Sequence, residues 1–259
     1  MTTEDLHILL YDGSFEGFLT CVFEVYERKL ELVTIKKNTE TQSSLFGQSE
    51  DVITDLKKSK RVWKGLGKKT SSVGRMRLIY AFLSEHEDIA DILLRYIQHV
   101  FKNKDMVDSD FGNVDILKVS QLAKSVGREK HRMEAFVRFR LTKDNLYFAT
   151  VEPDFNVLPL IQKHFKARYA DQKWMIYDLK RNYGIYYDLK KVEFIQMELP
   201  ENFDATKTSE DFFADEELQF QNLWHDYFQS TNIESRKNMK LHVRHVPKRY
   251  WKYLSEKLP

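Results

Sequence analysis

Apolar residues in the N-terminal third of the chain form short runs separated by segments with a helical repeat. His7–Tyr11 is one such run and predicts a strand, which the turn pair Asp12–Gly13 ends. Ser14 is a suitable helix cap, and apolar residues then recur every three or four positions from Phe15 to Tyr26, which predicts a helix. The other elements expected in this part are strands at 30–36 and 52–54 and helices within 56–84, interrupted near 65–67, at 89–100 and at 114–130.

The period of the pattern changes to two in the middle of the chain, between residues 133 and 141, which predicts a strand. A turn at 142–145 joins this strand to a second one at 146–151, so that the two form a hairpin. The next helix has Asp154 or Asn156 as its expected cap. Further strands are predicted at 174–178, 183–188 and 192–197. The result is an antiparallel sheet crossed by a helix.

These patterns predict an α+β protein in two parts. The N-terminal part, 1–112, combines strand–helix structure with several helices and packs with the sheet-containing part, 113–259, which ends in a basic tail. One integrated domain is the alternative division. A short aromatic helix is also expected at 220–228. Hydrophobic residues make up 42% of the 259 residues, which is enough for a core and excludes a mostly disordered chain.

The chain contains a single cysteine, Cys21. One thiol excludes an internal disulfide framework, a four-cysteine zinc site and a self-contained iron–sulfur cluster, and it suits a reducing compartment. No apolar run approaches the ~20 residues that cross a bilayer, and the N-terminus begins with acidic rather than basic residues. We therefore expect a cytoplasmic protein without a metal site, a bound cofactor or a membrane partner.

Two stretches of the chain contain many basic residues and no acidic residue, although the net charge of the whole chain is only +2. The first, 56–84, holds nine Lys or Arg, and the second, 236–255, has aromatic residues between its cations. Clustered cations favour a phosphate backbone through counterion release, and aromatic rings between them can stack on unpaired bases. The residues selected as nucleic-acid-binding candidates are Lys64, Lys68, Lys69, Arg75, Arg132, Arg244, Lys248, Arg249, Tyr250 and Trp251.

The basic stretches also have a purely structural interpretation. Either stretch could be a solvated basic surface, and the tail could be a docking helix that packs on its domain through Tyr250, Trp251 and Leu254. The acidic segment 201–217 could also neutralise the stretch 56–84 within the same chain. In that case the basic residues would have no nucleic-acid partner.

The polar residues considered for catalysis are His131, Arg138, Asp154, His164 and Asp178. His131 is expected where a helix passes into a strand, and a histidine at such a rim can act as a general acid–base. Asp178 and Asp188 lie at strand ends of one hairpin and could form a carboxylate pair for acid–base or metal chemistry. The structural alternatives are a core histidine at His164, a helix cap at Asp154 and two turn residues in the hairpin.

The chain combines several stretches that occur together: LYDGSFEGF at 10–18, EKHR at 129–132, FVRF at 136–139, PDFNVLPL at 153–160, HF at 164–165, QKWMIYD at 172–178, VP at 246–247 and YW at 250–251. Together they resemble a bacterial protein family of unknown function whose label places it in DNA metabolism. The resemblance covers essentially the whole chain.

The resemblance implies a context of DNA modification or repair. Similar proteins accompany a radical-SAM protein assigned to DNA modification or repair, and some relatives continue into a C-terminal domain similar to a uracil-DNA glycosylase. Chemistry of either kind is expected to belong to a partner, because Cys21 is the only cysteine here.

We therefore expect a DNA-metabolism accessory protein that binds nucleic acid and works with a radical-SAM or glycosylase-type partner. Two alternatives remain open: an enzyme that acts directly on DNA or a nucleotide, and a protein–protein adaptor that binds no nucleic acid. Convergence of His131, Asp154, His164 and Asp178 in one pocket would favour the enzyme, whereas one continuous basic groove would favour the binding protein.

Overall fold

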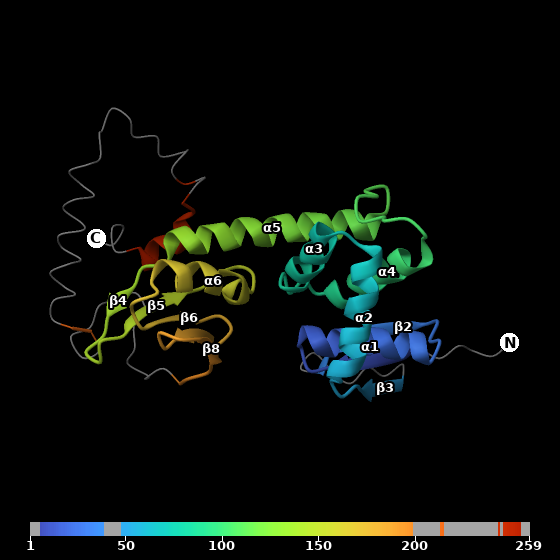
Figure 1. Cartoon of the computed structure of the whole chain (residues 1–259), viewed down its shortest axis with the longest axis horizontal. Coiled ribbons are helices and arrows are strands. Elements are labelled where there is room, and N and C mark those ends of the chain that lie inside the picture. Colours follow the sequence, from blue (N-terminus) through green and yellow to red (C-terminus); the bar gives the residue numbers. More distant parts are fainter. Residues whose placement is uncertain (1–5, 39–47, 199–212, 215–242, 244–245, 255–259) are drawn as a thin grey trace, which may run out of the picture. The chain divides into compact units, whose positions relative to one another are not determined.

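The computed structural model describes residues 6–38, 48–198, 213–214, 243 and 246–254 and is shown in Figure 1. The chain forms two compact units, Met1–Gly127 and Arg128–Pro259. Within the described residues, the first unit is mainly helical with a small sheet, and the second is built on a larger sheet, so the predicted α+β class is confirmed. No described helix is both long and apolar enough to cross a bilayer. The helix expected at 220–228 lies outside the described residues.

A three-stranded parallel sheet begins the first unit. β1 (His7–Tyr11) lies between β2 (Val33–Lys37) and β3 (Gln48–Asp51) and is parallel to both. β1 is apolar because a central strand is covered on both faces, and residues 8–11 are all buried. The strand predicted there is confirmed. β3 precedes the strand expected at 52–54, because this edge strand consists of four polar residues that give no hydrophobic signal.

Capped helices follow β1 and β3. α1 (Phe15–Glu27) begins after Ser14, whose hydroxyl accepts the Gly17 N–H at 2.9 Å, as the sequence predicted. α2 (Leu56–Lys69) begins after Asp55, whose carboxylate accepts the amides of the two lysines that follow Leu56, at 2.7 and 3.2 Å. Both caps satisfy amides that have no partner within their own helix.

α2 continues through Gly65, where the sequence predicted an interruption. This glycine serves helix packing, because a Cβ atom on it would lie 3.3 Å from Cζ of Phe101 on α4 (Ile89–Lys102). The helix ends instead at Thr70, and α3 (Ser72–Phe82) follows it. The glycine therefore marks a close contact between two helices and not a helix end.

The helices of the first unit enclose one apolar core. Its fully buried members include Leu9 on β1, Phe18 on α1 and Leu93 on α4. A polar contact also joins α4 to the sheet edge, because the Asp91 carboxylate accepts the Ile35 N–H of β2 at 2.8 Å. Burial of such an edge amide without an acceptor costs about 1–3 kcal/mol, so this contact helps to fix α4 on the sheet.

The second unit contains a mixed sheet in the order β4-β5-β6-β7-β8. Three of its four strand pairings are antiparallel, as expected, but β5 and β6 are parallel. α6 (Leu158–Arg168) connects these two strands as a crossover, and a crossover returns the chain to the same end of the sheet. The strands are β4 (Arg140–Leu141), β5 (Tyr147–Val151), β6 (Trp174–Asp178), β7 (Tyr183–Tyr187) and β8 (Val192–Ile195).

α5 (Val114–Phe136) is longer than the pattern predicted and includes the first part of the segment expected as a strand. Only β4, at the end of that segment, is a strand. In the second unit, Glu129 and Met133 of α5 and Val137 just after it are buried at spacings of four residues. One member of this stripe is a glutamate, so the hydrophobic pattern does not show that the helix continues beyond residue 130.

The entry to α6 differs from the expected cap. Val157 occupies the N-cap position and makes no side-chain cap bond. Asn156 instead accepts a hydrogen bond from the Tyr183 hydroxyl, and Asp154 forms an ion pair with Arg249. Both expected caps are therefore engaged in tertiary contacts.

Gly184 on β7 generates a prediction. A Cβ atom there would lie 2.9 Å from the Ile176 carbonyl oxygen and 3.0 Å from Cδ2 of Tyr177. Gly184→Ala should therefore lower the free energy of unfolding by about 1–3 kcal/mol, measured in urea. Gly127→Ala is the control, because its Cβ would meet Tyr80 only at 3.7 Å and alanine favours a helix by about 0.5–1 kcal/mol. Equal losses in both variants would contradict the prediction.

Candidate functional site

Exposed cations follow one face of α2. Five of them recur at spacings of three or four residues, which places them on the same side of the helix. We call them the α2 cation row: Lys57, Lys60, Arg61, Lys64 and Lys68. At 1.5 Å per residue the row extends for about 16 Å. Within the part of the chain that the structure describes, none of these five side chains forms an ion pair.

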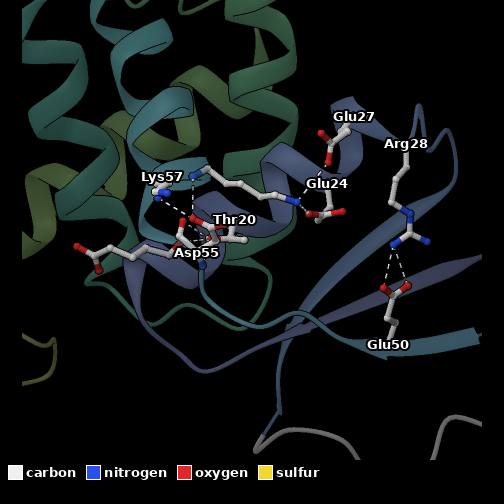
Figure 2. A network of polar contacts seen from close by, with 9 residues as sticks. Thr20, Glu24, Glu27, Arg28, Glu50, Asp55 and Lys57 are labelled. Carbon is white, nitrogen blue, oxygen red and sulfur yellow. Dashed lines mark hydrogen bonds and ion pairs between the residues drawn. The ribbon is translucent and has the colours of Figure 1, made fainter.

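The contact between α1 and α2 fixes the rotation of α2 about its axis. In Figure 2, Asp55, which caps α2, donates its N–H to Thr20 Oγ1 at 3.2 Å. Lys58 forms salt bridges with two residues of α1, with Glu24 at 2.6 Å and with Glu27 at 3.3 Å. The hydrogen bond to Glu24 raises the pKa of Lys58. Lys58 is therefore positively charged, and the carboxylates of Glu24 and Glu27 balance its charge. The α2 cation row occupies the remaining, exposed face.

The structure separates the candidate residues of the first basic stretch into two pairs. Lys64 and Lys68 are exposed and belong to the α2 cation row. Lys69 is partly buried and donates to the Asn103 carbonyl at 2.9 Å, and Arg75 is partly buried as well. Lys64 and Lys68 are therefore better placed than the other two for contact with a phosphate.

A buried carboxylate, Glu129 on α5, gathers the polar groups of the second unit. Its side chain is 1% exposed, and it accepts hydrogen bonds from the Tyr250 hydroxyl and, at 2.9 Å, from the Asp154 N–H. Arg249 and Arg132 lie 3.3 and 3.4 Å from Oε2. Arg249 also pairs with the Asp154 carboxylate. We call these five residues the Glu129 cluster, and its arginines are occupied by partners within the unit.

The described part of the tail forms a short 3-10 helix, η3 (Lys248–Tyr253). Tyr250 is buried, and Trp251 is partly buried and donates its indole N–H to a backbone carbonyl of the tail at 3.0 Å. The Lys248 ammonium lies 5.9 Å from the centroid of the Trp251 ring. Arg244 lies outside the described residues. Of these aromatic candidates, only Trp251 has an exposed part that a base could contact.

Asp178, at the end of β6, is fully buried and is neutralised by Arg181. Oδ2 lies 2.8 Å from Nη1 of Arg181, and Oδ1 accepts the amides of Lys180 and Arg181. Burial raises the pKa of Asp178, whereas the bonds from Arg181 act in the opposite direction. The same guanidinium donates to the Asp154 carbonyl at 3.1 Å. Arg181 therefore connects Asp154 with Asp178.

The two histidine candidates contact a different carboxylate, Glu134 on α5. Nδ1 of His131 and Nδ1 of His164 each lie 3.9 Å from one of its oxygens. Lys130 pairs with the same carboxylate, and the His131 side chain is 87% exposed. Arg138 donates to nearby backbone carbonyls. These contacts place the catalytic candidates in two groups, with the histidines around Glu134 and the aspartates around an arginine.

The cavity beside the Glu129 cluster is small. Its volume is about 10 Å³, which holds about one water molecule. Among the residues that the structure describes, no three His, Cys, Asp or Glu side chains gather in a way that could hold a metal ion. The cavity is lined by Met133, Phe136, Val151, Glu152, Tyr250 and Tyr253.

Sequence reasoning missed two residues that organise the second unit, Glu129 and Arg181. Glu129 stands in the polar run EKHR, and only its spacing from Val126 and Met133 marks it as inward-facing. Arg181 gave no signal, because the burial of its partner Asp178 cannot be recognised from a strand end. The α2 cation row, by contrast, follows helical spacing, which shows from the sequence that its five cations share one face of the helix.

These units define an α+β protein with a helical part and a mixed sheet. Residues 87–256 match the model of the family DUF4130, a domain of unknown function, and the match covers more than half of the chain. The chain belongs to this family, which confirms the expected membership of an uncharacterised family. No curated protein and no solved structure matches the chain. The match includes the Glu129 cluster and begins after α2.

The Glu129 cluster predicts a stabilising role for one hydroxyl. Tyr250→Phe removes a donor from a buried carboxylate, so it should lower the free energy of unfolding by about 1–3 kcal/mol. Tyr186→Phe is the control, because the Tyr186 hydroxyl forms no hydrogen bond with a described residue. Denaturant titration of both variants measures the difference, and similar midpoints for the two would refute the role.

A second prediction concerns acid stability. Glu152 follows β5 and accepts hydrogen bonds from Lys252 and Tyr253, which lower the pKa of Glu152. The resulting stabilisation is present above the unfolded pKa of about 4.3 and is lost as the pH falls through the lower folded pKa. Glu152→Gln should therefore flatten the fall in melting temperature between about pH 6 and pH 3. Tyr253→Phe should flatten this fall in melting temperature less, because Lys252 still pairs with Glu152. If the melting temperature of Glu152→Gln falls with pH in parallel with that of the wild type, the prediction is wrong.

Proposed function

We propose that the protein binds nucleic acid through the α2 cation row and acts as an accessory factor in DNA metabolism. The observation that carries the proposal is the row itself, whose five exposed cations lie on one helix face without an ion pair among the described residues. Cations held this close repel one another. A polyanion removes this repulsion and releases its own counterions on binding, which favours the complex.

The dimensions of the row suit an extended phosphate backbone. Neighbouring cations on a helix face are separated by about 5–6 Å, and long lysine stems let each ammonium reach a separate phosphate. Duplex DNA carries about one negative charge for every 1.7 Å of its axis, so several phosphates can lie along a row of about 16 Å. A single small anion would engage only part of the row.

The resemblance described above supplies the biological context of the proposal. Similar proteins accompany a radical-SAM protein of DNA modification or repair or continue into a uracil-DNA-glycosylase-like domain. We propose a partner of this kind in the bacterial cytoplasm. The partner would supply the chemistry, because a single buried cysteine, Cys21, cannot ligate an iron–sulfur cluster.

Removal of three lysines from the row tests the proposal. A variant with Lys60→Ala, Lys64→Ala and Lys68→Ala should bind single- and double-stranded DNA more weakly. On single strands, its slope of log affinity against log salt should be lower by about 2, because each phosphate contact contributes roughly 0.7. Fluorescence anisotropy at several salt concentrations measures both quantities.

The control removes the same charge from the second unit, at the exposed residues Lys163, Lys173 and Lys190. Its affinity and salt slope should stay close to those of the wild type. Equal losses in the two variants would show that net charge and not the row is responsible. No DNA binding by folded wild-type protein at low salt would leave the protein–protein adaptor as the better explanation.

A further inference from the structure

A pocket of about 420 Å³ opens on the first unit between α1, α2 and α4. Its volume lies in the range of about 300–1,000 Å³ that is typical of small-molecule sites. Half of the side chains around it are aromatic, and one residue of each charge accompanies them. The lining residues are Phe23, Tyr26, Glu27, Arg61, Val62 and Phe101.

Tyr26 offers an aromatic ring to this pocket. Its side chain is exposed, at 44%, although tyrosine rings usually lie at least partly in a core. The ring contacts Phe101 of α4 edge to face, with centroids 5.6 Å apart. Gly65 of α2 has no side chain and so leaves room for Phe101. An exposed ring supported in this way is a stacking platform for a flat ligand.

Arg61 belongs both to the pocket and to the α2 cation row. Its guanidinium lies 5.4 Å from the centroid of Phe23, and the Lys58 ammonium lies 5.1 Å from the same ring. The contact with Phe23 keeps Arg61 at the pocket, and Lys58 packs on the same ring. A strand whose phosphates lie along the row therefore passes beside an aromatic pocket.

We infer that this pocket takes one unpaired nucleobase of a single strand whose phosphates lie along the α2 cation row. The inference rests on the proposed function, because the row positions the strand. The base stacks on Tyr26, and Arg61 contacts the adjoining phosphate. A base inside a duplex must first leave its stack and its partner, so the pocket favours single strands over duplexes.

Glu27 gives the pocket a preference among bases. Its Oε2 lies 3.3 Å from the Lys58 ammonium, and a carboxylate can accept further hydrogen bonds on its other lone pairs. Adenine, cytosine and guanine carry an exocyclic amino donor, whereas thymine presents carbonyl oxygens in its place. The carboxylate therefore favours the three amino-bearing bases over thymine.

The first test compares Tyr26→Ala with Phe111→Ala. Phe111 is a matched control in the same unit, because it is 45% exposed and has the Arg77 guanidinium 5.6 Å from its ring centroid but does not line the pocket. Tyr26→Ala should weaken binding of a short oligodeoxyadenylate by about 5- to 150-fold. Its duplex affinity and its salt slope should stay nearly unchanged, and Phe111→Ala should alter none of these values.

The second test uses Glu27→Ala and measures the ratio of affinities for oligodeoxyadenylate and oligothymidylate. The wild type should prefer the adenylate, and the variant should bring the ratio closer to one. A ratio is unaffected by the general gain in DNA affinity that follows the loss of a negative charge. Thermal melting of each variant shows whether it is folded.

The outcomes separate this inference from the proposed function. Loss of DNA affinity in the lysine variant together with unchanged single-strand affinity in Tyr26→Ala would overturn the pocket and support the row. Equal losses for single strands and duplexes in Tyr26→Ala would also overturn the pocket. If Tyr26→Ala does not fold, an unchanged base ratio in Glu27→Ala overturns base recognition. If the pocket instead binds an apolar peptide or a small molecule, substitution of Tyr26 or Glu27 should leave DNA affinity and the base ratio unchanged, which would overturn the inference.

Discussion

Burial of one narrow face of α2 decides how the first unit presents its charges. Ser59, Val62 and Leu66 are buried at spacings of three and four residues, and the α2 cation row lies on the opposite side of the same helix. The packing that buries one face of α2 therefore also exposes the cations on the opposite face. The Asp55 cap (Figure 2) and the salt bridges of Lys58 with α1 fix the same rotation. A rotation that hid the row would expose the buried face to water.

Several basic residues of the second unit, unlike the α2 cation row, pair with buried carboxylates. Glu129 and Asp178 are almost inaccessible to water and hold the guanidinium groups of Arg249 and Arg181. The side chains of Arg181 and Asp178 are only 9% and 0% exposed, and removal of one partner from such a pair leaves an uncompensated charge, which costs about 3–5 kcal/mol. Arg249 and Arg181 therefore stabilise the fold, whereas the cations of the α2 row remain available to a ligand.

The family match and the proposed binding surface occupy different parts of the chain. The match at 87–256 includes the Glu129 cluster and the mixed sheet, whereas α2 precedes it. The pocket draws on both parts, because Phe101 lies within the match and Arg61 lies before it. Arg61 belongs to both parts of the proposed binding site, since its guanidinium lies in the α2 cation row and also lines the aromatic pocket. A strand bound in this way would contact the α2 cation row through its phosphates and the pocket through one base.

The sequence by itself determined the elements whose signal is local: the β1 strand, the Ser14 cap with the helix after it, the hairpin of β6 and β7 and the α+β class. Caps, turns and periodicity act between residues about two to four positions apart. Only the tertiary structure decided the full length of α5, because its buried stripe includes Glu129, whose partner Arg249 lies 120 positions further along the chain. It also decided that Lys68 is exposed while Lys69 reaches the Asn103 carbonyl. Burial of a charged group depends on partners that distant segments supply, and no local pattern records them.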